Sequence, residues 1–360
     1  MDRFACGTQV VSGQGAMEIL AQRQWARLLV AAEPRLADTQ TVRQIVNAAK
    51  NPQWEILTDV DPEPTMHQAV EGSRRIQAFR PDLVVALGGR NVMDWAKAMV
   101  CFSRHSCELV MVPAAFGAGS EMTGRVTLTH NGRRHLLRDR TMCPDMVILD
   151  PELQGPVSKA SVSEGGFELL ASALESYTGE QGSFLRLIHA REAFASGVAA
   201  LPAAFAGNGA VLDRLRMASV LAGLAVEETG LGLCRAMGNS LGTVFGISRG
   251  KAAAILLPAI IGCNAHGAGR RYAELSRAAG MGGSREEIGV RNLRTGLARL
   301  RRELGLPGTL VQSGVDIRSV WNNGRRVVEL TLEDPECRNN PVAVDDFMVR
   351  RILEEITGRI

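Results

Sequence analysis

The sequence predicts two domains, an α/β domain over residues 1–154 and an all-α domain over residues 155–360. The first part alternates short aliphatic runs with segments of helical periodicity, which is typical of parallel strands connected by crossover helices. After about residue 155 the strand pattern disappears, and Leu, Ala, Ile and Met recur at helical spacing. The boundary is expected near Asp150-Pro151, where an aliphatic strand ends at a proline turn. A chain of 360 residues is long enough to give each domain a core of its own.

Five aliphatic runs are the expected strands of the first domain. They are apolar on both faces, as expected of strands that are covered by helices on each side. The runs are 28–32, 55–57, 83–87, 109–112 and 147–149. Asn131-Gly132 lies between two further β-like segments, and both residues tolerate the positive φ of a tight turn. The sequence therefore predicts a β-hairpin, made of 126–129 and 133–137, that is inserted into this domain.

The second domain is expected to consist of helices alone. Its apolar residues recur at intervals of three and four, which places them on one face of a helix. The segments with this spacing are 183–206, 212–228, 250–265, 269–280, 290–304 and 343–357.

Composition excludes several classes of partner. The net charge is only +3 and the basic residues are scattered, so we expect no nucleic-acid partner. The seven cysteines form no CxxC pair and are interpreted as reduced, which predicts a cytoplasmic protein. The N-terminus has no basic leader followed by an apolar run, and we expect no membrane span because no uncharged stretch approaches the required length.

Two glycine-rich loops indicate a ligand site in the first domain. Gly88-Gly89 joins an aliphatic strand to a helix, a geometry in which backbone N–H groups and the helix dipole can receive a phosphate. A second loop, 113–123, also follows a strand. Both loops should therefore open at the carboxyl edge of one sheet, where α/β sheets bind ligands. A tight strand-to-helix turn without a ligand explains the two glycines equally well.

Several motifs, taken in order, resemble the iron-dependent (group III) alcohol dehydrogenases. The resemblance covers nearly the whole chain and is greatest to the propanol and ethanol dehydrogenases of bacterial microcompartments. It rests on 88–97, 117–123, 144–153, 173–177, 230–233, 254–258 and 339–341. It implies the fold shared with dehydroquinate synthase, in which an α/β dinucleotide-binding domain precedes an all-α domain. It also implies a homo-oligomer, a dimer, that is cytoplasmic or lies within a microcompartment.

The resemblance further implies an NAD site, with some departures from the family pattern. Glu33 matches the acidic residue for the adenosine ribose, where a carboxylate would repel a 2′-phosphate and favour NAD over NADP. The matching loop residues are Gly88, Gly89, Asp94, Gly117 and Ser120. The departures are Arg90-Asn91 in place of Gly-Ser, Ala114-Ala115 in place of two threonines, and Arg134 in place of Lys. Arg90 is expected either to pair with the pyrophosphate or to fill its space.

The family's metal ligands are replaced in this chain. One Asp and three His are expected, but the matching positions hold Glu168, Ser172, Arg235 and Arg249. A guanidinium has no lone pair for a metal, and a neutral Ser hydroxyl is a poor ligand, so we expect no metal. Two arginines that face Glu168 would instead substitute fixed positive charge for the cation. The alternative is a salt-bridge cluster that only fills an abandoned metal site.

The expected function follows from this resemblance. It is an NAD(H)-linked oxidoreductase that interconverts a small aldehyde, or another carbonyl compound, and its alcohol without a metal. Arg235 or Arg249 would stabilise the developing alkoxide, with Ser172 or Asn239 as hydrogen-bonding groups. Asn239 stands where the family has a further active-site His. The expected partner is a small aldehyde or alcohol, or an anionic carbonyl compound. Two alternatives remain: an inactive member that serves as a structural or regulatory partner, and a non-redox enzyme that acts on an anionic substrate in an arginine-lined cleft.

Overall fold

The computed structural model describes residues 6–37, 40–153, 157–179 and 183–358. The chain divides into two compact units between Val157 and Ser158, slightly later than the boundary expected from the sequence. The first is called the sheet unit below, and the second the helical unit.

The sheet unit is built on six parallel strands in the order β1-β8-β5-β4-β2-β3. All five predicted aliphatic runs are confirmed as strands, and β1 is an additional short edge strand. The bounds are β1 Gln9–Ser12, β2 Arg27–Ala32, β3 Gln53–Leu57, β4 Leu83–Gly88, β5 Glu108–Pro113 and β8 Met146–Leu149. The central strand β4 is buried along its whole length. This explains the absence of hydrophobic alternation in its sequence.

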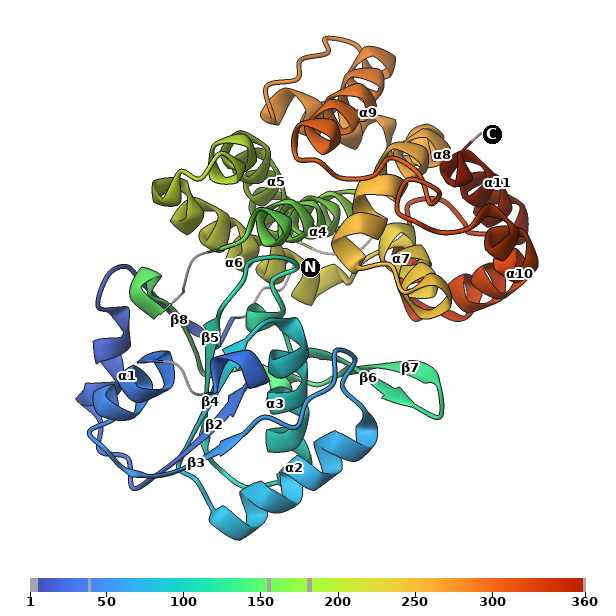
Figure 1. Ribbon diagram of the computed structural model, residues 1–360. Helices are drawn as coiled ribbons and strands as arrows, with labels where there is room; N and C mark the ends of the chain where they lie inside the picture. The colour runs from blue at the N-terminus through green and yellow to red at the C-terminus, as the bar shows by residue number, and fades with distance from the viewer. Residues whose placement is uncertain (1–5, 38–39, 154–156, 180–182, 359–360) are drawn as a thin grey trace. The chain divides into compact units, whose positions relative to one another are not determined.

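Helices cover both faces of this sheet (Figure 1). They are α1 Gln40–Ala48, α2 Met66–Phe79 and α3 Arg90–Ser103. On one face, Leu28 and Val30 of β2 pack in a single core with Ile45 of α1. On the other face α2 and α3 lie close together, since a Cβ at Gly72 would lie 1.9 Å from Met99 Sδ.

Strand order places a topological switch point between β2 and β4. The chain runs from β2 to β3 on one side of β2, and then returns to β4 on the other side. Ligands of doubly wound sheets bind at the carboxyl ends of the strands at such a point. In this register Ala32 pairs with Leu87, so the segments that follow β2 and β4 begin side by side.

The predicted hairpin is confirmed as the antiparallel pair β6 Arg125–His130 and β7 Arg133–Arg138. Asn131 and Gly132 both have positive φ, 50° and 70°, as the two-residue turn requires.

The helical unit contains eight α-helices within its described residues, drawn from green to red in Figure 1. They are α4 Lys159–Thr178, α5 Phe184–Phe205, α6 Leu212–Thr229, α7 Leu233–Phe245, α8 Arg249–Ala278, α9 Glu286–Glu303, α10 Ile317–Glu333 and α11 Asp346–Thr357. The separation of 250–265 from 269–280 was wrong, because one helix, α8, spans both. Gly267 and Gly269 within this helix are sites of close packing, where an added Cβ would meet Pro341 and Glu286.

Helix α8 also corrects the expectation that no apolar stretch of this chain approaches the length of a membrane span. It is long and apolar enough to cross a membrane, with a mean hydropathy of 1.4 over 18 residues, but 67% of that window is buried inside the protein. A buried central helix of a packed bundle has the same composition as a membrane span, and α8 packs against α4, α7 and α9.

Two glycines at these contacts provide a test of the packing. A Cβ at Gly250 would lie 2.3 Å from the main-chain oxygen of Glu164, whereas a Cβ at Gly238 would lie 3.6 Å from Ala252 Cβ. Gly250→Ala should lower the free energy of unfolding by about 2–3 kcal/mol, because α4 and α8 must move apart. Gly238→Ala should be neutral or stabilise by up to about 1 kcal/mol, because it only improves helix propensity. Urea unfolding of both variants measures this, and equal destabilisation by the two would contradict the packing described.

Candidate functional site

In the sheet unit, Glu33 joins the ends of β2 and β4. Its Oε1 accepts a hydrogen bond of 2.7 Å from the Gly89 N–H, at the start of α3. A Cβ at Gly88 would lie 2.9 Å from Glu33 Cγ, and Gly88 has a φ of 157°. Glycine is therefore needed at position 88 for both space and backbone conformation. The predicted acid and the predicted glycine loop are neighbours in the fold.

Arg90 and Asn91 begin α3, where the family pattern has Gly-Ser. Arg90 Nε lies 3.3 Å from Asp94 Oδ2, and its Nη2 donates to Thr127 Oγ1 of the hairpin at 3.1 Å. Asn91 is half-buried. The Arg90 guanidinium is thus held toward the hairpin.

Asp94 and Ser120 belong to a buried network around Lys97. The Lys97 side chain is fully buried, and its Nζ lies 3.1 Å from Asp94 Oδ1 and donates to Ser120 Oγ at 3.0 Å. Ser120 Oγ donates to Asp94 Oδ1 at 2.6 Å. Burial by itself raises the pKa of Asp94, but the charges of Lys97 and Arg90 outweigh it and lower the pKa to about 2. These two predicted cofactor residues brace the loop that follows β5 against α3.

The remaining predicted residues of the sheet unit lie around this network. The Ala114 N–H donates to the carbonyl of Gly88 at 2.9 Å, which ties the two glycine-rich loops together. Ala115 and Gly117 are half-buried in the second loop. Arg134 lies on β7 and forms an ion pair with Glu63.

In the helical unit, the predicted residues come from three helices. Glu168 and Ser172 lie one turn apart on α4, Arg235 and Asn239 lie one turn apart on α7, and Arg249 begins α8. Arg235 Nη1 donates to Glu168 Oε1 at 3.0 Å, and Ser172 Oγ donates to the main-chain oxygen of Glu168 at 2.9 Å. All of them except Asn239 line one cavity of only about 10 Å³, which is at most the room for one water molecule.

Carboxylates surround the guanidinium of Arg235. Arg235 is only 8% exposed; burial tends to lower its pKa, but the charge of Glu168, aided by Glu175 and Glu336, raises it. Glu175 is buried in the same cavity wall and accepts from the Cys234 N–H at 2.6 Å. Burial raises the pKa of the Glu175 carboxyl to about 7, against the opposing effect of the Gly232 and Cys234 N–H groups. The Arg235 cation therefore compensates a group of acidic side chains.

Asn239 is fixed by a residue that the sequence did not indicate. Asn239 Nδ2 donates to Asp334 Oδ2 at 2.9 Å, and Asp334 Oδ1 accepts from the Glu336 N–H at 3.0 Å. A carboxylate only accepts hydrogen bonds, so it determines which end of the Asn239 amide faces it. Asp334 caps the short helical turn after α10, and the signal that could have found it is the Asp-Pro pair typical of such a cap.

Family models match both units. Residues 7–151 match iron-containing alcohol dehydrogenase, and residues 163–357 match the C-terminal part of the Fe-containing alcohol dehydrogenase family. The chain belongs to the iron-containing alcohol dehydrogenase family. It is 30% identical to the 1-propanol dehydrogenase PduQ of Citrobacter freundii, over 99% of this chain and 100% of that protein. This confirms the expected relation to propanol dehydrogenases.

Other members and solved structures agree. The NADPH-dependent butanol dehydrogenase of Clostridium saccharobutylicum is 24% identical over 98% of this chain and 97% of that protein. The iron-containing alcohol dehydrogenase from Thermococcus thioreducens has a TM-score of 0.90 at 24% identity and covers 98% of this chain and 99% of its own. Sulfoacetaldehyde reductase from Bifidobacterium kashiwanohense, in complex with NAD+, has a TM-score of 0.88 at 20% identity and covers 99% of both chains. These structural likenesses confirm the predicted fold.

The residues at the family's metal position do not fit a metal ion. Glu168 is engaged by Arg235, and Ser172 is engaged by the backbone of α4. Neither arginine can donate a lone pair. Within the described residues, no group of three or more His, Cys, Asp or Glu side chains has an arrangement that could hold a metal ion.

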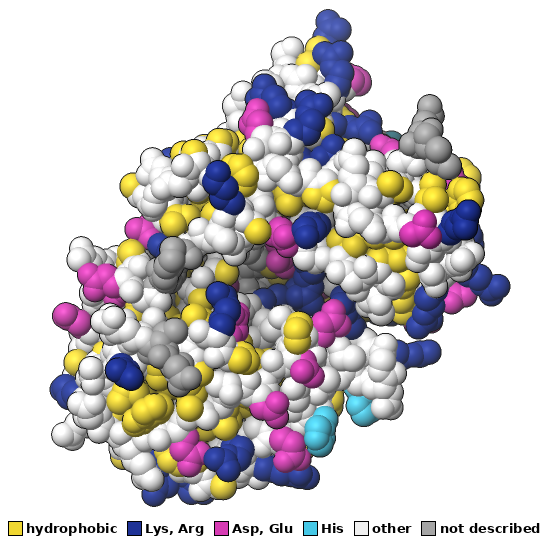
Figure 2. All heavy atoms as spheres, viewed as in Figure 1, with side chains coloured by type: hydrophobic (Ala, Val, Ile, Leu, Met, Phe, Trp, Pro, Cys, Tyr) yellow, Lys and Arg dark blue, Asp and Glu magenta, His cyan; other side chains and the backbone are white. Residues whose placement is uncertain are grey.

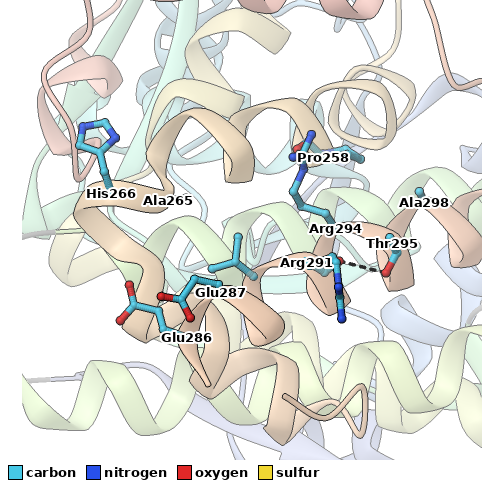
Figure 3. Close-up of a pocket in the computed structure, with 10 residues that line it drawn as sticks. Pro258, Ala265, His266, Glu286, Glu287, Arg291, Arg294, Thr295 and Ala298 are labelled. Atoms are coloured by element: carbon cyan, nitrogen blue, oxygen red, sulfur yellow. Dashed lines mark hydrogen bonds between the residues drawn. The ribbon is translucent and has the colours of Figure 1, made fainter. Parts of the chain in front are cut away.

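A larger cavity of the helical unit contains none of the predicted residues. It lies between α8 and α9, with a volume of about 660 Å³. Figure 3 shows Glu286 and Glu287 toward one end and Arg294 beside Pro258. Arg294 donates to the main-chain oxygen of Pro258 at 2.8 Å and lies 3.2 Å from Glu355, so it links α8, α9 and α11. Because Arg294 serves as a link between helices and the larger cavity holds none of the predicted residues, we assign the candidate site to the other group. We call it the Arg235 cluster; its members are Glu168, Ser172, Arg235, Asn239 and Arg249.

The pKa of Glu175 gives a test of this cluster. The folded protein binds this proton more tightly than the unfolded chain, in which the pKa is near 4.5. Its contribution to stability is therefore complete below pH 4.5 and is lost as the pH rises to about 7. Glu175→Gln keeps the acceptor for Cys234 but cannot ionise. Between pH 5 and 8, the free energy of unfolding of the native protein should fall by on the order of 2–3 kcal/mol relative to this variant.

Urea unfolding across this pH range measures the effect. The control is Glu192→Gln, an exposed carboxyl on α5. A difference between Glu175→Gln and the native protein that stays constant from pH 5 to 8 would show that Glu175 is not a perturbed acid.

Proposed function

We propose that the chain is an NAD(H)-linked oxidoreductase that interconverts a small aldehyde and its alcohol without a bound metal. The observation that carries the proposal is the ion pair of the buried Arg235 with the half-buried Glu168, at positions that match the family's metal ligands. Family membership supports the reaction class, and the NAD+ complex of sulfoacetaldehyde reductase supports the cofactor.

The sheet unit offers residues that fit a dinucleotide. The N–H groups at the start of α3 and the positive end of its dipole suit a pyrophosphate. Glu33 lies at the switch point, where an acidic side chain accepts from the ribose hydroxyls. When bound, the nicotinamide would supply or accept a hydride.

The helical unit offers positive charge for the oxygen of the substrate. As hydride reaches a carbonyl carbon, negative charge develops on the oxygen, and a fixed guanidinium stabilises that charge without reorganising. Arg235 is fixed by Glu168, and Arg249 lines the same cavity. Asn239, oriented by Asp334, is a candidate hydrogen-bonding partner of the substrate.

A second candidate is an inactive member that serves as a structural or regulatory partner of another protein. It is favoured by the small volume of the cavity and by the carboxylates that already compensate Arg235. The expected dimer and the cytoplasmic or microcompartment location remain part of the proposal, supported by the similarity to the propanol dehydrogenases.

The test combines metal analysis, an NADH titration and a panel of short aldehydes. Turnover of the metal-free protein supports the enzyme, binding of NADH without turnover favours a non-redox function, and no binding favours the inactive partner. Arg235→Met should lower kcat by about 10²–10³-fold, which is the typical loss of one transition-state donor. Unchanged turnover in both Arg235→Met and Arg249→Met would overturn the role of the arginines.

Two further variants separate chemistry from folding. Arg216→Met removes another buried arginine that pairs with a carboxylate, Asp213 of α6, and it should leave kcat unchanged. Arg235→Lys keeps the charge but loses the planar pair of donors, so it should recover part of the activity. Thermal unfolding of each variant shows whether it is folded.

A further inference from the structure

The end of β2 carries a second charged residue beside the predicted ribose acid. Pro34 begins a short helical turn, Pro34–Leu36, that returns Arg35 to Glu33. Arg35 Nε donates to Glu33 Oε2 at 2.6 Å, while Glu33 Oε1 accepts from the Gly89 N–H. Both oxygens of the carboxylate are therefore engaged by donors of the protein itself.

This arrangement changes the charge that a cofactor would meet. An acidic residue at this place selects against NADP because its negative charge repels the 2′-phosphate. Here the guanidinium of Arg35 neutralises the charge of Glu33, and the start of α3 adds roughly half of a positive charge. The net charge at the end of β2 is therefore no longer negative, and the repulsion that would exclude the 2′-phosphate of NADP is removed.

Arg35 is also free to bind an anion. Its side chain is 68% exposed, and within the described part of the chain the hydrogen bond of its guanidinium is the one from Nε. Its two terminal amino groups keep the planar fork that matches a phosphate. An exposed arginine reaches such a group with little loss of hydration.

We propose that Arg35 binds the 2′-phosphate of NADP(H), so that the chain uses NADPH as well as NADH. The inference rests on the proposed dinucleotide-linked function and deepens it. Glu33 then acts in two ways: it accepts from the ribose of NAD(H), and it holds Arg35 in place for the phosphate of NADP(H).

Titration of the full-length protein with NADH and with NADPH, followed by fluorescence, tests the proposal. The native Kd values should agree within about tenfold, whereas a repelling carboxylate would separate them by about 100-fold or more. Arg35→Ala should weaken NADPH binding by about tenfold and change NADH binding by less than about twofold.

The chain offers a matched control at the opposite edge of the sheet. Arg23 is 67% exposed and pairs with Glu108, the first residue of β5. Arg23→Ala therefore removes a similar surface ion pair at the other end of the strands, away from the switch point. It should change neither affinity. Tight NADH binding with exclusion of NADPH, or an equal effect of Arg35→Ala on both cofactors, would overturn this inference and leave the proposed function standing. Failure of both cofactors to bind would overturn the two together.

Discussion

The helical unit depends on the compensation of buried charge around Arg235. Glu168, Glu175 and Glu336 come from α4 and from the turn after α10, and all three act on one guanidinium of α7. An isolated buried charge costs several kcal/mol, so the guanidinium of Arg235 needs compensating carboxylates around it. Here the balancing positive charge is covalently part of the chain, and the space left beside it is about 10 Å³.

The sheet unit shows a related use of charge at its switch point. Glu33, Arg35 and the start of α3 form one neutralised group. A separate buried network, centred on Lys97, braces α3 and the second glycine-rich loop. Figure 2 shows acidic and basic side chains intermixed over much of the visible face.

Much of the fold could be predicted from the sequence, because strands and helices that bury their apolar residues leave a clear pattern. The six parallel strands differ from the prediction only by β1, in which polar Gln9 and Ser12 flank only two apolar residues, so that no aliphatic run marks it. The break between residues 265 and 269 was wrong, because one continuous helix, α8, spans both segments. The apolar stretch in α8 is long enough to cross a membrane, contrary to the expectation from the sequence. Its burial against other helices, and not its composition, identifies it as a core helix.

The candidate site was harder to predict. The Arg235–Glu168 pair followed from the resemblance, which matched both residues to metal-ligand positions, and from the need to pair buried charge; the structure confirms this contact. Asp334 and Arg35 were missed because their partners are set by turns, and a turn leaves a weaker signal than a periodic element. The roles of Asp94 and Ser120 also depend on Lys97, whose burial is determined by tertiary packing.

The stoichiometry of metal binding distinguishes a site compensated by Arg235 from a metal site. The purified protein would be dialysed anaerobically against Fe²⁺ or Zn²⁺, and the bound metal would be measured by elemental analysis, with turnover recorded before and after chelation. We expect substoichiometric metal and turnover that a chelator does not change, because the guanidinium of Arg235 cannot act as a ligand and already pairs with Glu168. One metal ion per chain, lost in Glu168→Ala and required for turnover, would contradict it.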